Sequence, residues 1–185
     1  MRRILDAIYR AALWAAALCL LAIAVLVLAQ VGGRVLDTAL KAAGRAPLGF
    51  QILSLSEIAG FLLAGASFLA LGPTLKAGGH IRVTMFLAML GAGGRRAVET
   101  LAALFGLVCA LYLTWHMAAL ALESWRFNEL SIGLMPIPLV WPQIPLGLGA
   151  VVLAIALVDE LAILVSRGDF SFRLAEDAAT LGKEG

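Results

Sequence analysis

Residues 11–33, "AALWAAALCLLAIAVLVLAQVGG", contain no charged side chain. A helix needs about 20 consecutive apolar residues to cross the hydrocarbon core of a bilayer. The run exceeds the roughly 7 to 15 apolar residues of a signal peptide, and no convincing small-residue cleavage site follows it. The whole chain agrees, since 62% of its residues are hydrophobic and 14% are charged, against about 25% charged in soluble domains. The stretch therefore predicts a retained membrane helix.

Three more apolar stretches predict spans at about 56–75, 98–122 and 141–165. The last charge-free region is longer than a span needs, and its first part is "MPIPLVWPQIP". Because proline disfavours a helical preceding residue and lacks a backbone donor, residues 131–140 should be extended. The fourth helix should begin near Trp141 or Pro142, with Pro145 in its first turn. We predict an all-α membrane protein, with one four-helix domain at 1–168 and a cytoplasmic tail at 169–185.

The distribution of Lys and Arg predicts the orientation. Cytoplasmic segments of membrane proteins carry an excess of these residues. Ten of the 14 lie before the first span, between the second and third spans, or in the tail: Arg2, Arg3, Arg10, Lys76, Arg82, Arg95, Arg96, Arg167, Arg173 and Lys183. Both termini are therefore expected in the cytoplasm. The net charge of only +2 does not suggest nucleic acid as a partner.

The connector between the second and third spans contains "HIRVTMFLAML", residues 80–90. As a helix it would be about 16 Å long, roughly half of a hydrocarbon core, so it cannot span. We expect a short horizontal amphipathic helix in the cytoplasmic interface. Packing of this helix under its own bundle is the alternative. The residues expected to contact the interface or a partner are His80, Arg82, Met85 and Phe86.

The two histidines raise the possibility of a haem or quinone site formed by His80 and His116. Their predicted depths differ by most of the membrane, which disfavours one haem between them. A hydrogen-bonded residue between helices is another interpretation of His116. An ionisable residue inside a membrane is also a functional candidate by default.

Chemical motifs typical of enzymes are not found in the sequence. It has no Walker, HExxH, GxSxG or paired-cysteine motif, and we expect neither a cofactor nor a metal. The acidic residues fall near the ends of the spans, which predicts an interior without a buried acid. Small residues of the second and third spans, and both cysteines, are interpreted as packing residues: Gly60, Gly65, Ser67, Gly106, Cys19 and Cys109. An accessory or scaffold subunit, rather than an enzyme or an independent pump, fits this pattern.

Two segments resemble a known family. These are "GGHIRVTMF" after the second span and "ELSIGLMPIPLVWPQIPLGLGAVVLAI" leading into the fourth. Together with four spans they resemble the small membrane subunit, of DctQ type, of tripartite ATP-independent periplasmic (TRAP) transporters, over residues 10–165. Family members often have an acid after "HIRV", where this chain has Thr84.

The resemblance implies partners and a location. The chain would sit in the bacterial inner membrane as part of a fixed frame beside a large multi-spanning subunit. That subunit would move substrate, typically a small organic carboxylate, by a sodium-coupled elevator motion. A periplasmic binding protein would deliver the substrate, and the horizontal helix would anchor the frame in lipid. Substrate and ion sites would belong to the large subunit.

The predicted outer loops contain a charged and aromatic group suited to receiving that binding protein. Arg45 lies in the first outer loop, and Glu123, Trp125 and Arg126 lie in the second, followed by Glu129. A membrane-interface role for Trp125 and a local Glu123–Arg126 pair are the alternatives.

Overall fold

The computed structural model describes residues 2–78 and 91–167. These residues form four long helices and the connectors between them. The helices are α1 (Arg2–Ala42), α2 (Leu55–Lys76), α4 (Ala92–Phe127) and α5 (Val140–Arg167). Each contains one predicted span, and each has a stretch long and apolar enough to cross a membrane. The predicted all-α architecture with four long apolar helices is confirmed. The predicted horizontal helix at 80–90, including His80, Arg82, Met85 and Phe86, and the tail at 169–185 lie outside the described residues.

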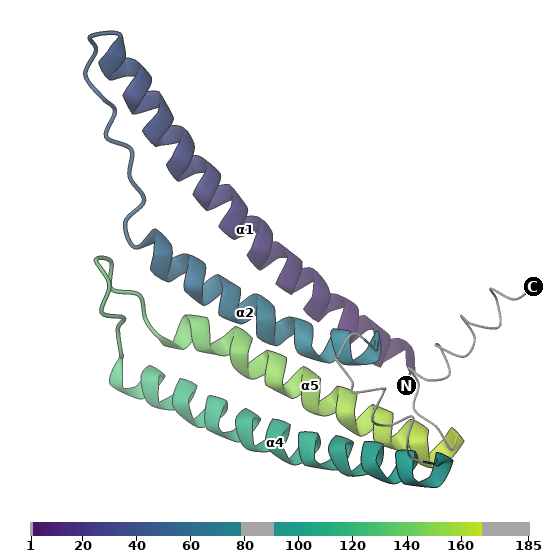
Figure 1. Ribbon diagram of the computed structural model, residues 1–185. Helices are drawn as coiled ribbons and strands as arrows, with labels where there is room; N and C mark the ends of the chain where they lie inside the picture. Colours follow the sequence, from purple (N-terminus) through teal and green to yellow (C-terminus); the bar gives the residue numbers. More distant parts are fainter. Residues whose placement is uncertain (1, 79–90, 168–185) are drawn as a thin grey trace, which may run out of the picture.

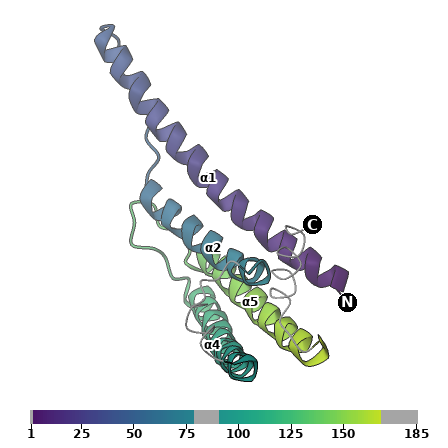
Figure 2. The same cartoon turned by 45° about the vertical axis from the view of Figure 1, so that its right-hand side comes forward.

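The helices lie side by side in the order α1, α2, α5, α4 (Figure 1). α5 packs against both α2 and α4, whereas α1 packs mainly against α2. Figure 2 shows α1 leaning away from the other helices toward its C-terminal end. The start of α1 and the end of α5 lie at one end of the bundle, the terminal end. Residues 43–54 and 128–139, the first and second connectors, lie at the opposite end, the connector end (Figure 1).

Helix α1 has 41 residues, which corresponds to about 61 Å, roughly twice the thickness of a hydrocarbon core. Beyond the charge-free run, helix-forming residues continue to Ala42 without Pro or Gly. Gly44 then adopts φ 72°, a conformation that favours glycine. Its N–H donates to the Lys41 carbonyl at 3.1 Å, and the Arg45 N–H donates to the Leu40 carbonyl at 2.8 Å. This Schellman arrangement ends the helix.

The seam between α2 and α5 is built on small residues. A Cβ at Gly72 would lie 2.7 Å from Val152 Cγ1, and one at Gly149 would collide with the α2 backbone at Phe68. Close approach of two helices needs residues of this size. Elsewhere on α5, Ala150 and Ala156 are fully buried, and Ala156 packs with Tyr9 and Ala12 of α1.

The predicted packing residues have mixed outcomes. Gly65 is buried and faces Pro145, as expected, and a Cβ at Gly106 would be in ordinary contact with Leu157. The expectation for Gly60 and Ser67 is wrong, since both are exposed. The Ser67 hydroxyl donates back to the Leu63 carbonyl at 2.8 Å. A glycine or serine in an apolar helix does not reveal which face packs, and these two lie on the outward face of α2.

The proline-rich entry to α5 agrees with the prediction in part. Leu130 and Pro138 form an isolated antiparallel bridge, but the chain bends at residues 132–135 between them, so 131–140 is not extended throughout. The helix begins at Val140, one residue before the predicted start, and Pro145 lies inside it. The placement of Pro145 in the first turn is therefore wrong, because the helix already starts ahead of Pro142, whose missing N–H costs nothing there.

Candidate functional site

The first connector folds back along the protruding end of α1. The Asp37 carboxylate accepts hydrogen bonds from the backbone N–H groups of Leu48 at 2.7 Å and Gly49 at 3.1 Å. Deeper in the helix, the buried Gln30 side chain accepts from the Ile52 N–H at 2.7 Å. Phe50 packs directly over Gly33. These contacts satisfy backbone donors that a connector would otherwise leave unpaired. Gln30 is the sequence signal that was missed, a hydrogen-bonding amide inside an apolar run.

The second connector is held by a buried hydroxyl. Ser124, near the end of α4, is 2% exposed. Its Oγ donates to Glu129 Oε2 at 2.6 Å and accepts from Gln143 Nε2, on α5, at 2.9 Å. A second serine, Ser131, accepts from the Ile137 N–H at 3.1 Å. One serine thus joins α4, the connector and α5, which gives this loop a defined shape.

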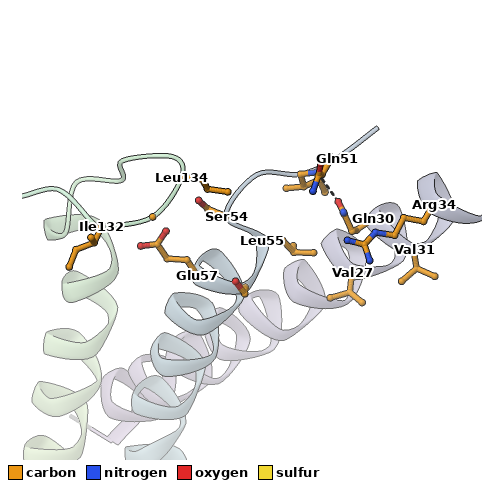
Figure 3. A pocket seen from close by; sticks show the side chains of 13 residues that line it. Val27, Gln30, Val31, Arg34, Gln51, Ser54, Leu55, Glu57, Ile132 and Leu134 are labelled. Atoms are coloured by element: carbon orange, nitrogen blue, oxygen red, sulfur yellow. Dashed lines mark hydrogen bonds between the residues drawn. The ribbon is translucent and has the colours of Figure 1, made fainter. Parts of the chain in front are cut away.

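The two connectors meet around an open groove of about 970 Å³ (Figure 3). The Met135 N–H donates to Ser54 Oγ at 2.9 Å, and the Glu57 carboxylate packs closely against Gly133. Figure 3 shows Glu57 and Ile132 on one side of the groove and Val27 and Arg34 on the other. Its lining mixes apolar side chains with both signs of charge, so it can accommodate an amphiphilic group at the end of the spans.

The predicted docking residues all lie at the connector end, but the fold does not gather them into one pocket. Arg45 lies just beyond α1, and Glu123, Trp125 and Arg126 lie in the last turns of α4; all four are exposed. None lines the groove. Glu123 and Arg126, both of which the structure describes, do not form the local pair considered above.

A charged cluster lies at the terminal end. Lys76 Nζ is 2.6 Å from Asp159 Oδ2 and 2.8 Å from Glu160 Oε1. The ammonium also lies 6.0 Å from the centre of the buried Tyr9 ring. Glu160 is 1% exposed, so the expectation of an interior without a buried acid is wrong at this end. Residue spacing could not reveal the pairing, because Lys76 and Glu160 come from helices far apart in the sequence.

His116 does not lie between the described helices. It is exposed on α4, with its ring stacked at a tilt on Tyr112 at a centroid separation of 4.2 Å. No described helix of this chain packs against it, because α4 turns another side, with buried Ala110, toward α5. Its interpretation as a hydrogen-bonded residue between helices therefore finds no partner within the described residues. His80, the other residue of the haem hypothesis, is outside the described residues. Within residues 2–78 and 91–167 no group of three metal-ligating side chains is found.

The cysteines also differ from each other. Cys19 packs against the cluster formed by Ala16, Ala66 and Leu69, as expected of a small packing residue. Cys109 is exposed on α4, so the packing interpretation is wrong for the described part of the chain.

Four helices of spanning length, with the ionic cluster and the hydrogen-bonded connectors at the two ends, define a multi-pass membrane protein. Comparison with known families specifies its class. The chain belongs to the DctQ component family of tripartite ATP-independent periplasmic transporters, whose family model matches residues 23–167. It is also similar to the ectoine TRAP transporter small permease protein TeaB of Halomonas elongata, at 26% identity over 112 residues. That match covers 60% of this chain and 58% of the relative.

Proposed function

We propose that this small permease component is a fixed frame subunit that carries no substrate pathway of its own. The observation that supports this is the closed seam between α2 and α5. Gly72 and Gly149 bring the two helices into backbone contact, and no room for a side chain is left at either position. A transport pathway normally shows broken helices or charges at mid-membrane. The seam has neither, and its ionic cluster lies at the terminal end.

The partners follow from the family. The chain would pair with a large multi-spanning subunit that moves a small organic acid by a sodium-coupled elevator motion. A periplasmic binding protein would deliver that acid at the connector end, where Arg45, Glu123, Trp125 and Arg126 are exposed. The bilayer is the third partner, and the segment 80–90, with His80, Arg82, Met85 and Phe86, would anchor the frame at its cytoplasmic surface.

The orientation is part of the proposal. The terminal end would face the cytoplasm of a bacterium and the connector end the periplasm, because ten of the 14 Lys and Arg residues fall in the sequence before the first span, between the second and third spans, or after the fourth. The antiparallel order of the helices, with the start of α1 and the end of α5 at the same end, supports an even number of crossings (Figure 1). Membership of a transporter family does not favour the haem or quinone alternative. A purified protein with a visible haem spectrum would revive it.

Reconstitution tests the frame role. The cognate large subunit is placed in proteoliposomes with or without this chain, at equal large-subunit density. Substrate-loaded binding protein and an inward sodium gradient are then supplied. We expect uptake only when both membrane subunits are present. Equal uptake by the large subunit alone would contradict the proposal, and uptake by this chain alone would contradict the absence of its own pathway.

A further inference from the structure

The outward face of α4 carries a regular stripe of large side chains. Its members recur at alternating spacings of four and three residues: Leu101, Phe105, Val108, Tyr112 and Trp115, with exposed fractions of 66%, 72%, 65%, 67% and 74%. The opposite side of α4, including Ala110 at 2%, packs against Leu157 and Ala154 of α5. The stripe is therefore turned away from the bundle, with the spacing that a second helix packing alongside would require.

Two polar groups lie within this apolar stripe. Tyr112 and His116 are both exposed, and their rings stack on each other. Within the described residues, neither side chain has a hydrogen-bond partner. Glu123, the next charged residue toward the connector end, comes seven positions after His116, which is about 10 Å along a helix. A short imidazole side chain cannot reach the aqueous rim over that distance.

A hydrogen-bonding group facing hydrocarbon without a partner is costly, so ionisable residues in spans almost always face protein or water. α1 provides the contrast. Its outward face has the same spacing and begins with the exposed Trp14, one turn from Arg10, where tryptophan is typical of the membrane interface. The members inside the span, Leu18, Leu21, Val25 and Leu28, are aliphatic and suit lipid. Its one strongly polar side chain within the span, Gln30, is buried and bonded to Ile52. The outward face of α4 therefore requires a polar partner, whereas the outward face of α1 can be covered by lipid alone.

We propose that the α4 stripe, from Leu101 to His116, is the seam at which the large membrane subunit packs, while the stripe on α1 faces lipid. The occupant is a transmembrane helix that presents a hydroxyl, amide or carboxyl group to His116 and Tyr112. This inference rests on the proposed function, because it assumes that a large subunit pairs with this chain. Beyond that function, it assigns the contact to α4 and the recognition to hydrogen bonds with His116 and Tyr112.

Site-specific photocrosslinking tests the location. A benzoylphenylalanine replaces Phe105 or Trp115 on α4, or Leu21 or Leu28 on α1, in membranes that contain the cognate large subunit. We expect adducts with the large subunit from the α4 positions and only lipid adducts from the α1 positions. The reverse pattern would overturn the inference while leaving the pairing intact. A dimer of this chain formed from α4, or only lipid adducts there, would also overturn it. If the two subunits fail to co-purify at all, the proposed function itself fails.

Substitution of His116 tests the chemistry. We expect His116→Leu to weaken the two-subunit association about threefold, the average effect of one interhelical hydrogen bond in a membrane protein. His116→Gln keeps a donor and an acceptor and should retain most of the association. Melting of the isolated subunit should change in neither variant, because the side chain is exposed there. Unchanged association of His116→Leu, or an equal loss in the isolated subunit, would overturn the assignment.

Discussion

The Lys76 ammonium, at the last residue of α2, lies 2.8 Å from the carboxylate of Glu160, which comes 84 residues later on α5. The Glu160 side chain is 2% exposed and that of Lys76 is 18% exposed. A buried pair of this kind is not strong evidence for net stability, but removal of one partner leaves an uncompensated charge. The pair therefore joins the two helices that form the closed seam.

Substitution of this pair should show coupling. Lys76→Met leaves two carboxylates together, one of them buried, and should cost about 3–5 kcal/mol of unfolding free energy. Glu160→Gln leaves Lys76 bonded to Asp159 and should cost about 1–3 kcal/mol. The double variant should cost less than the sum, because the buried carboxylate of Glu160 that loses its cation in Lys76→Met is then neutral, and only the partly exposed Asp159 keeps its charge. Thermal unfolding in detergent measures the cycle, and strictly additive losses would show that the two residues do not interact.

The close seam predicts strong sensitivity at Gly149. A side chain there would collide with the α2 backbone at Phe68. Gly149→Val should therefore cost about 3 kcal/mol or more and broaden the elution profile. Gly60→Ala is the matched control, since a Cβ there meets nothing within 4 Å, and it should be neutral or slightly stabilising. Similar effects of the two variants in thermal unfolding would argue against the seam.

The buried Ser124 hydroxyl predicts local loosening of the second connector. Ser124→Ala removes the partner of both Glu129 and Gln143 and should cost about 1–3 kcal/mol. Hydrogen exchange should accelerate at the amides of residues 129–139. Thr114→Ala is the control, because the Thr114 hydroxyl bonds only to a carbonyl of its own helix. Unchanged exchange in Ser124→Ala would mean that the serine does not hold the loop.

The proposed orientation predicts a labelling pattern. In a variant with Cys19→Ala and Cys109→Ala, single cysteines replace Lys41, Arg126 or Arg95. An impermeant thiol reagent applied to intact cells should label positions 41 and 126 but not 95, because only the connector end would face the periplasm. Labelling of all three positions after membrane disruption is the control. Strong labelling at 95 with none at 126 would reverse the topology.

The exposed cations of the connector end predict an effect on binding-protein capture. Arg45→Glu combined with Arg126→Glu should leave the two membrane subunits assembled. The binding-protein concentration for half-maximal uptake should rise severalfold at low salt and less at high salt, since exposed charges steer partners and are screened. Uptake curves at two ionic strengths check this. Identical curves for variant and parent at low salt would exclude these residues from the docking surface.

The spans could be predicted from local composition. Burial in a bilayer depends on a continuous apolar run, and each predicted span lies within one of the four helices. The proline-rich segment likewise located the start of α5 to within one residue. The length of α1 could not be predicted from apolar composition. The helix continues past the span through residues that favour helix but do not form an apolar run.

The faces of the helices were decided by tertiary structure alone. In a helix that is apolar nearly all round, residue spacing does not distinguish a face that packs on protein from one that meets lipid. Gly60 and Gly149 look alike in the sequence, yet one is open and the other contacts a backbone. The sequence around a charged residue near the end of a span does not show whether that residue is buried or exposed. Only the packing of α2 on α5 shows that Glu160 is buried beside Lys76. His116 is exposed for the same reason, since the side of α4 that packs on α5 is determined by contacts distant in the sequence.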